Sequence, residues 1–222
     1  RPDDPAKSLA ALAAGAALLF VIQLLDPWEL QPTIAGPSTL VDADHPTERA
    51  ADVPLDRRSI RAYQTRLRRL IDGLADAARR FAPPKRYWAV VGNGPNKVAA
   101  EEVRIKLSEL CYKSIAADAT EDKKHIDLSS EPLIVVCAAG LNGSTADDVA
   151  KEVAIFRAHK AAPIVIADEG ERRFGAALAV LAVPAVDPRL GFVLSAMAGH
   201  IFGYEAALAI DAQARPQREA RS

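Results

Sequence analysis

The chain is poor in several features, and each shortage argues against a class of protein. It has two cysteines in 222 residues, and its formal net charge is −1. So small a net charge gives no overall field to attract nucleic acid or anionic lipid, so we expect no nucleic-acid partner. Cys111 lies in a predicted helix and Cys137 in an apolar strand, where both should be small buried side chains in a reducing compartment. We therefore expect no disulfide and a cytoplasmic location.

Metal-ligand patterns are absent as well. The four histidines and two cysteines show no spacing typical of metal ligands, so no metal site is predicted. What the chain does contain is 50% hydrophobic and 26% charged residues. This is the profile of an ordinary globular protein, with one good-sized core or one domain plus an appendage.

The first apolar run falls short of the ~20 residues that a membrane-spanning helix needs. The run over residues 9–25 is shorter, rich in alanine and interrupted by Gln23. Acids as well as bases precede it and no cleavage motif follows it, which argues against a signal peptide. A buried helix or a subunit-contact helix is favoured, and a membrane segment in a tethered structural protein is the alternative. Because the chain begins with arginine, we expect it to be a piece of a longer protein.

Proline dominates the next segment. Prolines recur from Asp26 to Pro54, which argues against a long helix or strand there and favours a linker or a segment wrapped over a neighbour. Residues 1–55 are therefore predicted to be an extension that contains an apolar helix followed by a proline-rich linker.

Residues 56–81 return to helical periodicity. Arginines fill the face opposite the apolar one, and this basic face could contact RNA. Acids at Asp72 and Asp76 interrupt it, so a solvated helix face is favoured. The expected apolar face consists of Ile60, Tyr63, Leu67, Leu70, Ile71 and Leu74.

The remainder of the chain alternates between apolar strands and helices. This alternation is typical of a parallel sheet covered on both faces. Residues 56–222 are therefore predicted to form a doubly wound α/β domain with about five parallel strands flanked by helices. The expected strands are 87–92, 114–119, 132–138, 162–168 and 177–184, and the expected helices are 96–112, 145–160 and 190–210.

Two loops are expected at the carboxyl ends of these strands, where ligands bind in doubly wound sheets. The first is Gly92-Asn93-Gly94. It does not fit a dinucleotide-binding fingerprint, because Lys97 replaces the third glycine and no acid ends a second strand at the required distance. We interpret it as a tight turn, and whether a ligand also binds there is left open.

The second loop is "LNGST", residues 141–145. The hydroxyl groups of Ser144 and Thr145, together with free N–H groups at a helix start, could bind a sugar or a phosphate. Alternatively, one of these residues caps the helix, and the acids Asp147 and Asp148 satisfy the helix dipole. The sequence leaves both interpretations open.

The stretch "EVRIKLSELCY", residues 102–112, lies in the helix predicted after the first loop. Glu102, Lys106 and Glu109 are spaced i, i+4 and i+7, so all three lie along one stripe. Taken alone, they would be surface salt-bridge partners. The apolar stripe beside them is Val103, Leu107 and Leu110.

The same stretch carries a family resemblance. The frame E-x-x-x-K-x-x-E-x-x-Y, a short strand, and then a loop with "KKH" resembles the sugar isomerase (SIS) domain. More narrowly, it is similar to the second SIS half of glucosamine-6-phosphate synthase, which typically reads E-G-A-L-K-L-K-E-I-S-Y and then A-E-A-Y-A-x-G-E-x-K-H-G-P. The resemblance runs from about Arg57 to the C-terminus, where "FGYEAALAIDAQARPQR" is similar to the family's tail. The matching positions are Glu102, Lys106, Glu109, Tyr112, Lys124 and His125.

The resemblance implies an isomerase half-domain of a glutamine–fructose-6-phosphate aminotransferase. Glu109 would shuttle the proton, Lys106 would polarise or relay protons at the sugar oxygens, and Glu102 would position an amine or water. His125 would open the sugar ring from a neighbouring subunit. The implied ligand is a hexose phosphate, fructose 6-phosphate or glucosamine 6-phosphate, with no cofactor. The implied partners are further copies in a homo-oligomer, a first SIS half and a glutaminase domain.

Some positions depart from the family's pattern. Glu121 replaces a glycine, and H-G-P has become His125-Ile126-Asp127. The family's imine-forming lysine would align near Arg221, and arginine cannot form that imine because it stays protonated. The first SIS half, with its sugar-phosphate loop, is not within these residues. The alternative function is a non-catalytic, sugar-phosphate-binding regulatory SIS module.

Overall fold

The computed structural model describes residues 36–41, 50–55, 57–125 and 128–219. They belong to two compact units, one ending at Arg69 and the other beginning at Leu70. The apolar run over residues 9–25 lies outside the described residues, so its assignment as a buried or contact helix stays a prediction.

The two-stranded sheet in the first unit corrects the sequence prediction. β1 (Gly36–Val41) and β2 (Ala50–Leu55) pair in an antiparallel manner, where no strand was expected. Pro37 lies opposite Pro54 in this register. Each strand of a two-stranded sheet is an edge, so a proline can stand where its missing N–H would face away from the partner strand. Proline thus restricts these strands to edges and does not prevent them.

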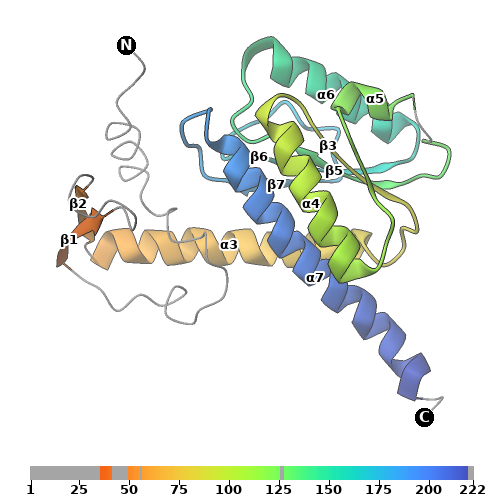
Figure 1. Ribbon diagram of the computed structural model, residues 1–222, viewed down its shortest axis with the longest axis horizontal. Coiled ribbons are helices and arrows are strands. Elements are labelled where there is room, and N and C mark those ends of the chain that lie inside the picture. Colours follow the sequence, from red (N-terminus) through yellow and green to blue (C-terminus); the bar gives the residue numbers. More distant parts are fainter. Residues whose placement is uncertain (1–35, 42–49, 56, 126–127, 220–222) are drawn as a thin grey trace. The chain divides into compact units, whose positions relative to one another are not determined.

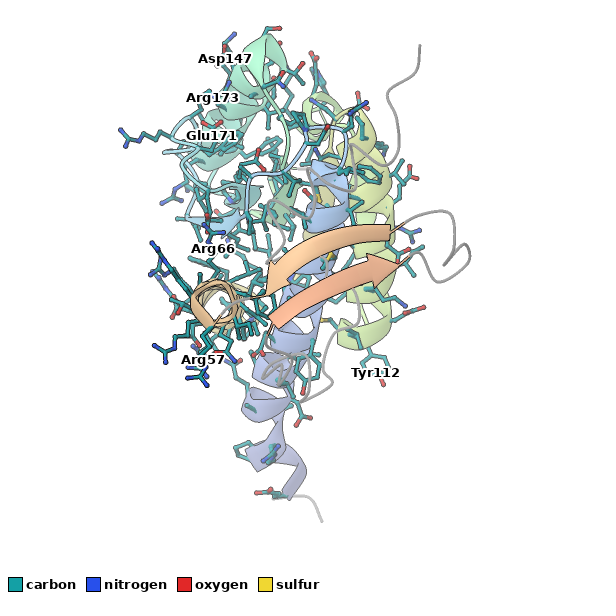
Figure 2. All side chains as sticks on the ribbon, turned by 90° about the vertical axis from the view of Figure 1, so that its left-hand side faces the viewer. Arg57, Arg66, Tyr112, Asp147, Glu171 and Arg173 are labelled. Carbon is teal, nitrogen blue, oxygen red and sulfur yellow. The ribbon has the colours of Figure 1, made fainter. Side chains whose placement is uncertain are left out.

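The helix predicted over 56–81 is confirmed as α3 (Arg57–Phe81), which contains the boundary between the two units. Tyr63, Leu67 and Leu74 of its expected apolar face are buried. The arginines of its opposite face, such as Arg57 and Arg66, are exposed and labelled in Figure 2. The amphipathic pattern therefore predicted both the helix and which of its residues are buried.

The second unit is built on a five-stranded, all-parallel sheet, as predicted. The strand order is β4-β3-β5-β6-β7, and all four pairings are parallel. The three central strands are buried almost throughout, which is why they are continuous apolar runs in the sequence. The strands are β3 (Trp88–Gly92), β4 (Ala116–Asp118), β5 (Leu133–Cys137), β6 (Ala162–Asp168) and β7 (Ala179–Val183).

Helices cover both faces of this sheet. α4 (Pro95–Cys111) and α7 (Gly191–Glu219) lie side by side on one face, and α6 (Gly143–Ala158) covers the other (Figure 1). The short α5 (Thr120–Lys123) follows β4 and contacts α6. Alternate strand residues supply the two cores, and the core under α6 combines Val91, Ile134, Val136 and Val165 with Val149, Val153 and Phe156.

α7 is by length and composition apolar enough, over Gly191–Pro216, to cross a membrane. Half of its apolar window is buried in the structure, and it packs on α4, β5, β6 and β7. Its apolar residues therefore serve the core of this unit, as those of a central helix in a globular domain do.

The close contact between α4 and α7 depends on glycine. A Cβ atom at Gly199 would lie 2.2 Å from Cγ2 of Val103, and one at Gly203 would lie 3.1 Å from Cδ2 of Leu107. Val103 and Leu107 are fully buried, whereas Leu110, expected beside them, is 40% exposed. Cys111 is buried instead, with Sγ 3.7 Å from the Gly203 carbonyl oxygen. It is a free thiol, as expected for both cysteines.

This contact predicts the effect of adding one methyl group. Gly199→Ala should lower the free energy of unfolding by about 1–3 kcal/mol, because Val103 is β-branched and enclosed and cannot move aside without strain. Denaturant unfolding followed by circular dichroism measures the change. Gly73→Ala in α3 is the control: nothing lies within 4 Å of a Cβ there, so that change should stabilise by about 0.5–1 kcal/mol. A Gly199→Ala variant as stable as the unmodified chain would contradict the close contact.

Candidate functional site

The sheet reverses its direction of growth between β3 and β5. The chain passes from β3 to β4 on one side, and from β5 through β6 to β7 on the other. In doubly wound folds, ligands bind beyond the carboxyl ends of the two strands at this switch point. Gly92-Asn93-Gly94 follows β3, and the loop with Ser144 and Thr145 follows β5. Both loops singled out from the sequence therefore flank the switch point.

A buried polar network holds the two loops together. Asn96, in the first turn of α4, donates from Nδ2 to the Ala139 carbonyl oxygen at 2.9 Å. Ser195 of α7 donates to Asn96 Oδ1 at 2.7 Å and accepts from the Ala139 N–H at 3.2 Å. Asn96 and Ser195 are both buried. Fully paired polar groups in an apolar core fix one arrangement of the loops, because breaking any bond leaves a buried group unsatisfied.

The first loop is a tight turn, as interpreted from the sequence. A Cβ at Gly92 would lie 2.2 Å from the Asn96 carbonyl oxygen, and Gly94 has φ +55°. Only glycine fits the first position without moving backbone, and the second is in the region that favours glycine. Asn93 Oδ1 accepts from the Thr120 N–H at 3.0 Å, which joins this loop to the start of α5.

In the second loop, the structure contradicts the interpretation that Ser144 or Thr145 caps the helix. The residue at the N-cap of α6 is Asn142, and its side chain makes no capping bond. Ser144 and Thr145 lie inside the first turn and are exposed. Neither hydroxyl therefore caps the helix. The sequence placed the helix start two residues too late, because Gly143 is a poor helix former and its φ of +52° is unusual at this position.

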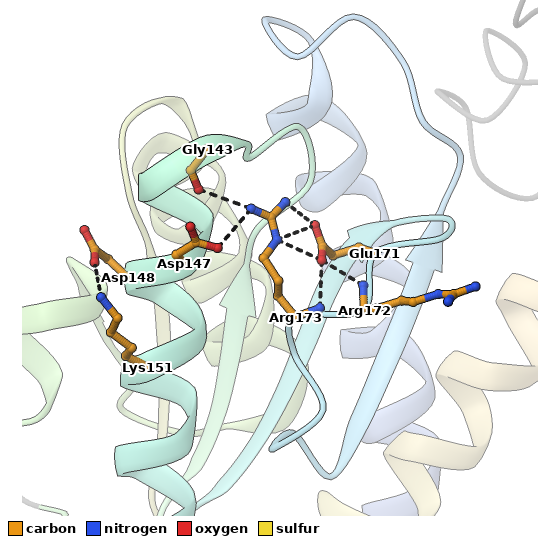
Figure 3. Close-up of polar contacts among 7 residues, drawn as sticks. All are labelled: Gly143, Asp147, Asp148, Lys151, Glu171, Arg172 and Arg173. Carbon is orange, nitrogen blue, oxygen red and sulfur yellow. Dashed lines mark hydrogen bonds and ion pairs between the residues drawn. The ribbon is translucent and has the colours of Figure 1, made fainter.

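Arg173, from the loop after β6, contacts the start of α6 (Figure 3). It donates to the Gly143 carbonyl oxygen at 3.1 Å and to Asp147 Oδ1 at 3.3 Å. Its Nε also lies 3.0 Å from both carboxylate oxygens of Glu171. Hydrogen bonds from the Arg173 side chain lower the pKa of Glu171 to about 2. Arg173, which contacts the helix turn that carries Ser144 and Thr145, is thus already paired with two carboxylates.

A neighbouring carboxylate secures the same loop from the end of β6. Both oxygens of Asp168 accept from the Gly140 N–H, at 3.0 and 3.1 Å. Partial burial raises the pKa of Asp168, and the Gly140 hydrogen bond opposes that rise. The loop after β5 is therefore tied to α7, to β6 and to the β6–β7 loop, and it is a rigid part of the fold.

The acid–base stripe lies along the outer part of α4. Lys106 Nζ donates to Glu109 Oε2 at 3.0 Å. The hydrogen bond and charge of Glu109, with a smaller contribution from Glu102, raise the pKa of Lys106. Lys106 therefore stays a cation at neutral pH. Tyr112, the last position of the family frame, is 95% exposed at the end of α4 (Figure 2).

His125 is exposed just after α5. The preceding residue, Lys124, bridges Glu152 of α6 at 2.9 Å and Glu121 at 3.2 Å. These two carboxylates raise the pKa of Lys124. Lys124, which the resemblance matched to a family position, therefore anchors this segment to α6 and leaves His125 at the surface.

The candidate residues form separate groups. At ~1.5 Å per helical residue, Glu109 lies about 20 Å along α4 from Gly94. The loops at the switch point and the far end of the stripe therefore do not meet in one chain. The structure adds a residue that sequence reasoning missed: Nε2 of His200 in α7 lies 3.2 Å from Oε1 of Glu102. A separation of 98 residues leaves no local sequence signal for that pairing.

Neither a family model nor a curated protein matches the sequence. Solved structures do. The C-terminal domain of glucosamine-fructose-6-phosphate aminotransferase from Francisella tularensis has 19% identity and a TM-score of 0.51, over 70% of this chain and 47% of that chain. Tagatose-6-phosphate ketose/aldose isomerase from Escherichia coli has 20% identity and a TM-score of 0.52, over 69% of this chain and 44% of that chain.

A third structure is matched over most of its length. The sugar isomerase domain of the RpiR transcription factor from Sphaerobacter thermophilus has 14% identity and a TM-score of 0.50, over 71% of this chain and 92% of that chain. The chain has a fold of the sugar isomerase (SIS) type, as expected. It spans less than half the length of the aminotransferase domain and of the ketose/aldose isomerase.

The Glu171–Arg173 pair predicts a pH-dependent stability. Because the pKa of Glu171 falls from 4.5 to about 2 on folding, its contribution is present above pH 4.5 and is lost as the pH falls toward 2. Arg173 is 34% exposed, so solvent screens the pair, and Glu171→Gln should cost about 1 kcal/mol at pH 7. Thermal unfolding between pH 2 and 7 measures this. The control Asp148→Asn breaks an exposed pair with Lys151 and should cost under ~0.5 kcal/mol. Equal losses for Glu171→Gln at pH 2.5 and pH 7 would contradict the pairing.

Proposed function

We propose that this chain is a sugar-phosphate isomerase half-domain, part of a glutamine–fructose-6-phosphate aminotransferase that makes glucosamine 6-phosphate. The observation that carries the proposal is the stripe on α4. Glu102, Lys106 and Glu109 keep the family's spacing on one helix of a SIS-type fold, and Lys106 contacts Glu109 directly. The similarity to the aminotransferase domain and the ketose/aldose isomerase supports it.

Aldose–ketose isomerisation moves a proton between two adjacent carbons through an enediol-type intermediate. It needs a carboxylate that removes the proton and returns it to the neighbouring carbon, and a cation that stabilises the oxyanion charge. Glu109 has the first role and Lys106 the second. The raised pKa of Lys106 suits a permanent cation, since a lysine that exchanged protons would need a lowered pKa. Glu102 positions the amine or water.

The proposal assigns the remaining parts of the site to other chains or domains. His125 opens the sugar ring of a neighbouring subunit, which fits its exposed position away from the stripe of its own chain. The sugar-phosphate loop belongs to a first SIS half, and ammonia comes from a glutaminase domain. The loops with Asn93 and with Ser144 and Thr145 are the candidate contacts of this chain to a hexose phosphate.

A second function is favoured by one comparison. The sugar isomerase domain of a transcription factor is matched over 92% of its length, so a unit of this size also occurs in a regulator. A regulatory module that binds a sugar phosphate without converting it would need the fold and a binding loop. It would not need Glu109 or His125, and their shared spacing with the family favours the enzyme.

The stripe predicts a loss of rate in the complete natural protein. Glu109→Gln keeps the size and hydrogen bonding of the side chain and removes the base, so kcat should fall by ~10²–10⁴-fold with little change in substrate affinity. Lys106→Met should also lower kcat. Steady-state kinetics with fructose 6-phosphate measure both changes. Lys151→Met, on the exposed surface of α6, is the control and should leave kcat unchanged. Retained rates in Glu109→Gln and Lys106→Met, with unchanged sugar-phosphate binding, would favour the regulatory module.

The separation of the two groups of residues predicts that this chain is insufficient by itself. The isolated 222-residue chain should show no measurable isomerase or synthase turnover of fructose 6-phosphate, because the first SIS half is missing. A coupled assay for glucose 6-phosphate and glucosamine 6-phosphate would detect either product. Robust conversion by this chain alone would contradict the half-domain assignment.

A further inference from the structure

We propose that His200 is a positioning residue that holds the Glu102 carboxylate in its working orientation. This proposal rests on the proposed function, in which Glu102 positions an amine or water. His200 Nε2 lies 3.2 Å from Glu102 Oε1, across the seam between α7 and α4. The nitrogen is buried and has no hydrogen-bond partner among the residues that the structure describes. The nitrogen and the carboxylate oxygen are thus close enough to interact, but their geometry does not form a hydrogen bond.

The backbone fixes this pair. Gly199 precedes His200, and Val103 follows Glu102. These two neighbours pack against each other so closely that a Cβ atom at Gly199 would overlap Val103. A seam held by glycine against an enclosed valine leaves little room for either helix to shift. The long Glu102 side chain can therefore reach His200 without any movement of the main chain. Catalytic hydrogen bonds that are poorly aligned without substrate commonly tighten when substrate binds.

Lys106, the cation of the stripe, is hydrogen-bonded to Glu109, so His200 is the candidate for orienting the Glu102 carboxylate. The Lys106 ammonium donates to Glu109, at 3.0 Å. Among residues 57–125 and 128–219, His200 is the basic side chain whose nitrogen lies within 4 Å of the Glu102 carboxylate, at 3.2 Å. The side chains of Glu102 and His200 are 45% and 30% exposed, so the carboxylate is open to a ligand and the histidine is the more buried of the two. A carboxylate that must orient a small nucleophile needs such a second contact to restrict its rotation.

The experiment is a double-mutant cycle in the complete natural protein, with kcat and KM for fructose 6-phosphate as readouts. His200→Leu should lower kcat by ~10–100-fold with KM little changed, because misplacing a positioning group costs that order of rate. His200→Gln retains an N–H donor and should restore kcat to within about threefold of the unmodified protein. In a Glu102→Gln background, His200→Leu should cause no further loss.

The control and the contrary outcomes separate this proposal from the proposed function. His159→Leu changes an exposed histidine at the end of α6 and should leave kcat unchanged. If Glu102→Gln lowers kcat but His200→Leu does not, or if the two losses add, His200 has no positioning role and the enzyme assignment stands. If Glu102→Gln and Glu109→Gln both leave kcat unchanged, or the complete protein shows no turnover, the proposed function fails and the positioning role with it. A thermal unfolding midpoint of His200→Leu equal to that of His200→Gln excludes misfolding as the cause.

Discussion

The close approach of α4 and α7 is the constraint on which the rest of the second unit depends. Gly199 lets the backbone of α7 come against Val103, and one turn earlier Ser195 reaches Asn96 at the start of α4. The same contact therefore fixes the loops at the switch point and sets His200 beside the stripe. Glycine is needed here because it has no side chain. Any side chain at this position would separate the two helices and break both polar contacts.

Most of the fold could be predicted from the sequence because its signals are local. Apolar runs such as 162–168 gave the central strands, and alternation with helices gave the parallel sheet. The failures have local causes too. Because of Pro37 and Pro54, two edge strands were not predicted. The last helix was predicted to end at residue 210, where the apolar pattern ends, whereas α7 continues to Glu219. Apolar periodicity reports the buried part of a helix, so it does not mark the end of a helix that continues beyond the core, here through Pro216.

The candidate site was predictable only where its residues share one element. The spacing of Glu102, Lys106 and Glu109 gave the stripe because one helix carries all three. The contacts of Arg173 with Asp147 and of His200 with Glu102 could not be found in that way, since each joins two separate elements and follows from packing. The long-range pairs are also the ones that decide the local chemistry, because they determine which cation and which histidine stand next to each carboxylate.

The separation along α4 places a limit on how this chain can act on a sugar phosphate. A hexose phosphate is much shorter than the about 20 Å of helix between Gly94 and Glu109. One molecule cannot contact the switch-point loops and the far end of the stripe of the same chain. In the proposed assembly, a site built around Glu109 would therefore take its phosphate-binding groups from elsewhere than the switch-point loops of the same chain. The length of α4 thus explains why, in the proposed assembly, the acid–base stripe and the switch-point loops of one chain would not share a ligand molecule.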